Sequence, residues 1–143
     1  MNDMFIKQVS VFVENKAGAM SEVLDILAEE NIDMSALSVA DTSDFGILRL
    51  ILSEPEKAEK VLKEKGYVVK LTDVVAVGIE DKPGGLSKPL KVLKDNGIGI
   101  EYMYAFIGKV SNSALVVMKT SDPEKSLEVL ADMTVDAREI YRI

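Results

Sequence analysis

The feature that most constrains the fold is an internal repeat, in which residue 11 aligns with residue 77, an offset of 66. At this offset, eight of 24 positions are identical between Val11–Met34 and Val77–Ile100. Both segments place a glycine-containing turn between an apolar run and a helical pattern. Two residues are inserted later in the second copy, because Pro55 corresponds to Pro123. We therefore interpret the chain as a duplication.

The duplication predicts two domains, residues 1–72 (copy one) and 73–143 (copy two). Each is close to the smallest size that supports a core of its own, so we expect the copies to share an interface. Alternating apolar residues predict the strands, and apolar positions at i, i+3, i+4 and i+7 predict the first helix of each copy. The expected order is βαββαβ, with strands at 5–13, 33–40, 45–52, 67–71, 74–79, 100–107, 114–119 and 135–141, and helices that begin near residues 20, 55, 86 and 123.

The second helix of each copy has a start signal. Ser53-Glu54-Pro55-Glu56 and Ser121-Asp122-Pro123-Glu124 both read as a capping box with serine as the N-cap. Proline in the first turn costs no hydrogen bond there.

These elements predict an α+β fold of two ferredoxin-like βαββαβ units, each an antiparallel sheet with both helices on one face. The strand at 100–107 is too apolar for an open sheet edge in water. We expect it to pair with its counterpart at 33–40, which fuses the sheets into one eight-stranded sheet with the helices on one face. The other sheet face then needs cover, so we also expect a homodimer; the large side chains behind this expectation are Phe12, Met34, Tyr102, Tyr104 and Phe106.

The composition excludes several classes of function. The sequence has no cysteine and no histidine, so thiol chemistry is excluded and the commonest metal ligand and general base are missing. No nucleophile–base pair, metal cluster or phosphate loop is recognisable, so we expect no enzyme activity, no metal and no cofactor. The net charge of −7 argues against nucleic acid as a partner. No apolar run approaches a membrane span and the first residues lack a basic signal region, so we expect a cytoplasmic protein with no membrane partner.

Two segments of copy two resemble a known family. The turn Asp81-Lys82-Pro83-Gly84-Gly85-Leu86 follows the first strand, and Ile100-Glu101-Tyr102-Met103-Tyr104 forms the second. In a βαββαβ unit, these segments resemble the ACT domain, and the resemblance covers nearly the whole chain as two tandem copies. It implies a stand-alone regulatory protein of amino-acid metabolism that senses an amino acid and has no catalytic activity.

The resemblance also implies a binding site at an interface between two units. The turn after the first strand would supply backbone N–H groups for the effector's carboxylate, at a helix start where the dipole favours an anion. Asn15, Asp33 or Asp81 would bind its ammonium group. The matching positions are Asn15, Lys16, Ala17, Gly18, Ala19, Met20, Asp33 and Met34 in copy one, and Asp81, Lys82, Pro83, Gly84, Gly85, Leu86, Gly99 and Ile100 in copy two.

Other interpretations of these residues stay open. Gly18 and Gly84 are equally well explained as turn glycines, and Asp33 as a residue that satisfies its own helix-to-strand turn. The alternative function is a protein-interaction module that binds no ligand, or a regulatory subunit of a separate biosynthetic enzyme.

Overall fold

The structure, a computed structural model, describes residues 4–41, 44–110 and 113–135. Among these residues no helix is long and apolar enough to cross a membrane. The elements are β1 (Phe5–Glu14), α1 (Ala19–Glu29), β2 (Met34–Asp41), β3 (Phe45–Leu52), α2 (Pro55–Glu64), β4 (Val68–Ile79), α3 (Ser87–Asp95), β5 (Ile100–Val110), β6 (Ser113–Thr120) and α4 (Pro123–Val129).

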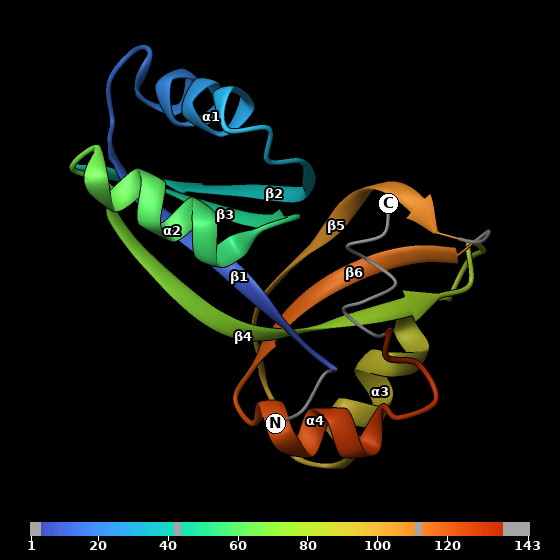
Figure 1. The fold of residues 1–143 in the computed structure, drawn as a ribbon. Coiled ribbons are helices and arrows are strands. Elements are labelled where there is room, and N and C mark those ends of the chain that lie inside the picture. The colour runs from blue at the N-terminus through green and yellow to red at the C-terminus, as the bar shows by residue number, and fades with distance from the viewer. Residues whose placement is uncertain (1–3, 42–43, 111–112, 136–143) are drawn as a thin grey trace. The chain divides into compact units, whose positions relative to one another are not determined.

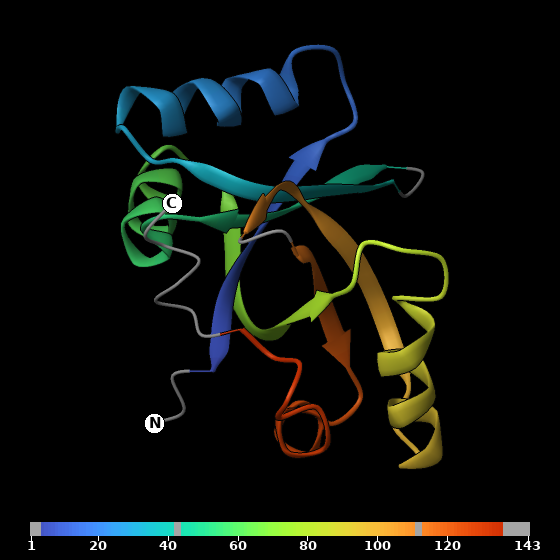
Figure 2. The same cartoon turned by 90° about the vertical axis from the view of Figure 1, so that its right-hand side faces the viewer.

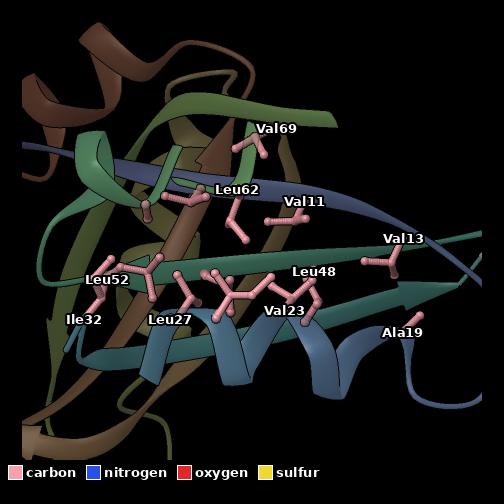
Figure 3. Packing of buried hydrophobic residues seen from close by; sticks show 14 residues of the cluster. Val11, Val13, Ala19, Val23, Leu27, Ile32, Leu48, Leu52, Leu62 and Val69 are labelled. Atoms are coloured by element: carbon pink, nitrogen blue, oxygen red, sulfur yellow. The ribbon is translucent and has the colours of Figure 1, made fainter. Parts of the chain in front are cut away.

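The chain divides into two compact units, one of Lys7–Thr72 and the other of Met1–Ile6 with Asp73–Ile143. In the first unit, β3 lies between β1 and β2 and is antiparallel to both. Both α1 and α2 bury their apolar stripes against these strands, with Val23 and Leu62 in the same cluster as Val11 (Figures 1 and 3). This cluster contains the i, i+3, i+4 stripe that the sequence predicts for α1.

The second unit repeats this arrangement. β6 lies between β4 and β5 and is antiparallel to both. Leu93 of α3 and Leu130, which follows α4, are each at most 1% exposed and pack with Val77 and Met118. Met4 and Phe5 pack against the same cluster, so the first residues of β1 belong to the core of copy two.

Two of the expected strands form a single strand. The ranges 67–71 and 74–79 join as β4, which runs without a break through Thr72 and Asp73. The polar pair at the copy boundary resembles a turn in the sequence, yet strand geometry continues through it. The expected strand at 135–141 lies almost entirely outside the described residues.

The expected eight-stranded open sheet with helices on one face is wrong. The described strands number six, in the closed barrel order β1-β3-β2-β5-β6-β4. In a closed order every strand has a neighbour on each side, so there is neither an open edge nor a single face for all four helices. The ferredoxin-like description of the fold is corrected in the same way.

Burial of the strand faces away from the helices also alters the argument for a homodimer. Several residues that belong to neither helix-facing cluster are at most 2% exposed in the single chain; examples are Ala36, Ile51, Val74, Ala76 and Leu115. Phe12, one of the side chains behind the expected homodimer, is 37% exposed. Part of the apolar strand surface is thus buried without a second chain, and the homodimer stays a prediction.

Both predicted serine caps are wrong. The N-cap of α2 is Glu54, without a side-chain hydrogen bond, and the N-cap of α4 is Asp122, which accepts a hydrogen bond from the Lys125 N–H. The two serines instead bind the backbone just before the second strand of each copy. Ser53 Oγ accepts from the Asp33 N–H at 2.9 Å, and Ser121 Oγ accepts from the Gly99 N–H at 3.0 Å.

Candidate functional site

The two glycine-containing turns have the same geometry. Gly18 has φ 85° and ψ −11°, and Gly84 has φ 82°. The N–H groups of Ala19 and Gly85 donate to the carbonyls of Lys16 and Lys82 at 3.3 and 3.0 Å. These features define type II turns, whose third residue needs a positive φ. Gly18 and Gly84 are therefore required by the turns, whatever these turns bind.

The second turn residue is Pro83 in copy two and Ala17 in copy one. This difference leads to a first prediction. Proline presets the φ of this position in a type II turn, and Ala17 is exposed. Ala17→Pro is expected to raise the free energy of unfolding by about 0.4–1 kcal/mol, because it restricts the unfolded chain. Pro83→Ala is the matched control and should lower it by a similar amount. Urea titrations of the two variants measure both changes, and a destabilised Ala17→Pro would show that the turns differ.

The residue after each turn glycine differs between the copies. A Cβ atom added to Gly85 would lie 2.0 Å from the Glu80 carbonyl oxygen, so no side chain fits there. Ala19 does carry a Cβ, is buried in the core of copy one and begins α1 directly. In copy two the helix starts later, at Ser87. The copy-two turn is thus built around a close approach that only glycine allows.

An ion pair spans each turn. Lys16 contacts Glu14 at 3.3 Å and Lys82 contacts Glu80 at 2.6 Å, all four side chains being exposed. The hydrogen bond and charge of Lys82 lower the pKa of Glu80, and the charge of Lys88 adds to this effect. Glu80 in turn raises the pKa of Lys82. Both groups keep their charges at neutral pH.

The starts of the second strands are held by backbone contacts. The Asp33 carboxylate accepts from the Met34 N–H at 2.9 Å, and the Asp33 carbonyl accepts from the Ser53 N–H. Gly99 makes the same backbone contact with Ser121. Asp33 thus has the local structural role left open by the sequence. Asp33 follows Ile32, which lies at the opposite end of α1 from Ala19 and its turn (Figure 3). The helix between these two ends is about 16 Å long.

An acidic residue that the sequence analysis missed lies beside the copy-one turn. Asn15 Nδ2 donates to Asp41 Oδ1 at 3.2 Å. Asp41 ends β2, and β2 runs antiparallel to β3, which returns to the end of β1. The strand order therefore brings Asp41 to Asn15, whereas Asp33 lies at the opposite end of β2.

A pocket of about 530 Å³ adjoins the copy-two turn. Its walls are the end of β4, the turn, the first residues of α3 and the segment after α4. Figure 2 shows the path of the backbone from β4 through this turn into α3. That segment is fixed to β4, because the Gly78 N–H donates to Met133 O at 2.7 Å and the Val135 N–H to Ala76 O at 2.9 Å. The lining has two cations, two carboxylates and an apolar part: Lys82, Lys88, Glu80, Asp132, and Ile79, Pro89, Met133 and Val135.

Copy one has a corresponding but smaller pocket of about 250 Å³. Phe12 stands where copy two has Gly78, and Glu22 stands where it has Lys88. Burial raises the pKa of Tyr67 to about 12, with a further contribution from its hydrogen bond to Glu22. The copy-one pocket is therefore smaller, and Glu22 makes it more acidic. The hydroxyl group of Tyr67 already makes a hydrogen bond to Glu22.

The structure places the predicted site residues in several groups. Gly84 and Gly85 line the larger pocket, and Lys16 and Ala19 line the smaller one. Leu86 lines a different hollow beside α3. The remaining turn residues are exposed: Asn15, Ala17, Gly18, Asp81 and Pro83. Met20 is partly buried. The last four predicted residues lie at the starts of the second strands: Asp33, Met34, Gly99 and Ile100.

Sequence reasoning missed the pocket residues Lys88, Asp132 and Thr134. Lys88 had a detectable signal, because the repeat aligns it with Glu22 and so reverses a charge next to the turn. Asp132 and Thr134 had none, since they reach the pocket only through the pairing of their segment with β4.

The closed strand order, the duplicated turns and the pocket beside each turn define a small protein built from two similar copies of one helix-and-strand unit. Among the described residues no group of three or more acidic residues could hold a metal ion. Residues 4–139 match the family of ACT domain pairs, and the chain belongs to that family.

Solved structures with a similar fold are known. A crystal structure of a protein from Bacteroides thetaiotaomicron is 43% identical with a TM-score of 0.90, covering 98% of both chains. The ligand-free regulatory subunit of aspartate kinase from Thermus thermophilus is 16% identical with a TM-score of 0.64, covering 91% of this chain and 93% of that one. The Thermus flavus regulatory subunit is 18% identical with a TM-score of 0.60 and the same coverage. No curated protein sequence matches the chain.

Proposed function

We propose that this ACT domain pair is a non-catalytic regulator of amino-acid metabolism whose effector is a small amino acid bound in the copy-two pocket. Membership of the family supports the regulatory role. The observation that carries the choice of ligand is the lining of the pocket of about 530 Å³. A free amino acid has an anionic and a cationic end, and this pocket offers side chains of both signs beside an apolar wall.

The charges assign an orientation to the ligand. Lys88 is exposed at the rim and is the cation for the carboxylate, since Lys82 already pairs with Glu80. The Gly84 N–H has no hydrogen-bond acceptor among the described residues and can add a donor. The Asp132 carboxylate binds the ligand's ammonium group, because the Glu80 carboxylate is already paired with Lys82. The apolar wall of Ile79, Pro89 and Met133 favours a small aliphatic side chain.

Copy one is the silent copy in this proposal. Its pocket has about half the volume, and Glu22 would repel a carboxylate at the position where Lys88 attracts it. The sequence-based expectation of a site at an interface between units, with Asp33 as a ligand, is replaced by a site within copy two. The regulated enzyme and a second copy of this chain remain the proposed macromolecular partners.

A calorimetric titration tests the site. After a thermal-shift screen of the twenty amino acids, Lys88→Ala is expected to weaken the best hit by about 10- to 150-fold, the effect of losing one charge-assisted hydrogen bond. Asp132→Asn should weaken it as well. Glu22→Ala, at the equivalent position of copy one, is the matched control and should leave the affinity unchanged.

Two results would overturn the proposal. Equal losses in Lys88→Ala and Glu22→Ala would show that the copy-two pocket is not the site. No binding of any amino acid by the parent at millimolar concentration would favour the ligand-free interaction module instead.

A further inference from the structure

The outward faces of α1 and α3 carry opposite charges at positions that the repeat makes equivalent. Asp25 of α1 aligns with Lys91 of α3, and Ala28 aligns with Lys94. All four residues are exposed. A duplicated helix that only needed to stay solvated could keep either sign, so the reversal is a difference between two surfaces of one chain.

The face of α3 is also hollowed. A groove of about 540 Å³ is lined by Leu86, Ser87, Leu90, Lys91 and Lys94. Leu86 and Leu90 pack only partly into the core of copy two, so each keeps exposed apolar surface. The groove therefore has an apolar floor and a basic rim.

The equivalent face of α1 has the complementary composition. Met20 and Leu24 are partly buried against the core of copy one, as Leu86 and Leu90 are in copy two. Asp25 lies next to them on the helix, one turn from Ser21. This face thus joins an apolar stripe to an acidic edge.

The charges of these faces are not used within the described part of the chain. None of the ion pairs or side-chain hydrogen bonds there involves Asp25, Lys91 or Lys94. They are available to a partner.

We propose that the α3 groove receives the α1 face of a second copy of this chain, with Asp25 of one copy at the Lys91–Lys94 rim of the other. Buried leucine and methionine surface supplies affinity, and the charges supply specificity. Contacts between two α1 faces or two α3 faces would bring like charges together and are disfavoured. This inference names the surface of the proposed homodimer and rests on that part of the proposed function.

The test exchanges the charges of the two copies. Variant one, Asp25→Lys with Ala28→Lys, gives α1 the charges of α3, so both of its faces are basic. Variant two, Lys91→Asp with Lys94→Ala, gives α3 the charges of α1, so both of its faces are acidic. All four positions are exposed, and circular dichroism checks that both variants fold.

Sedimentation equilibrium is expected to show a dimer of the parent that dissociates more readily at high salt. Each variant alone should dimerise at least about tenfold more weakly, because every α1–α3 contact now joins like charges. An equimolar mixture of the two variants should regain the parent's affinity within about threefold, because opposite charges meet again in every mixed contact.

Each contrary outcome is distinct. A parent that keeps the mass of one 15.6 kDa chain at micromolar concentration refutes the homodimer and this surface together. A parent dimer that neither variant weakens refutes the surface alone. Two weakened variants that do not recover on mixing refute the pairing of α1 with α3.

Discussion

Gly85→Ala is expected to lower the free energy of unfolding by about 2–3 kcal/mol, the upper part of the range for overpacking a close-fitting site. The added Cβ would lie 2.0 Å from the Glu80 carbonyl oxygen, which belongs to the same turn and cannot be displaced without opening it. Because Glu80, Lys82 and Gly84 all line the pocket, the variant should also lose the effector. Urea unfolding and calorimetry measure the two effects.

Gly84→Ala is the matched control for this prediction. A Cβ at Gly84 meets nothing within 4 Å, but its φ of 82° is unfavourable for alanine. The expected cost is about 1–2 kcal/mol, from the left-handed conformation alone. If Gly85→Ala proves no more costly than Gly84→Ala, the turn is more pliable than its geometry indicates.

Leu62→Ala is expected to cost about 2–5 kcal/mol of unfolding free energy. Leu62 is fully buried and belongs to the cluster that joins α2 to β1, β3 and α1 (Figure 3). Truncation removes its transfer free energy and leaves a cavity between helix and strands. A domain of this size has only about 5–15 kcal/mol of stability, so the loss is a large fraction of the total.

Lys60→Ala, on the exposed side of the same helix, should change the unfolding free energy by no more than about 0.5 kcal/mol. Chemical unfolding followed by circular dichroism compares the two variants. A Leu62→Ala loss below about 1 kcal/mol would mean that the surrounding side chains close the cavity.

The fold was predictable wherever local chemistry decides it. The offset of 66 residues gave the duplication, and the i, i+3, i+4 stripe gave the buried side of α1. The turn glycines followed from the positive φ that a type II turn requires. Gly97 has φ 70° and follows Asn96, the C-cap of α3, at a position where glycine commonly ends a helix.

Errors arose where a residue has several possible partners. Ser53 can cap the helix that follows it or bind the strand start that precedes it, and both choices satisfy the hydroxyl. The structure selects Asp33, which is 20 residues away, because β2 and β3 bring the two together. The same long-range pairing gives Asp33 its contact with Ser53 and puts Asp41 beside Asn15.

The sequence by itself thus determined the ACT domain pair, the order of its four helices and of the strands before and after β4, and the positions of both turns. Only the tertiary structure decided that six described strands close on themselves, that residues 68–79 form one strand, and that copy two holds the larger pocket. The physical reason is the separation in sequence between the residues that make each contact. Turns and helix faces depend on residues a few positions apart, whereas strand closure and pocket shape depend on contacts between segments such as Gly78 and Met133 that no local pattern encodes.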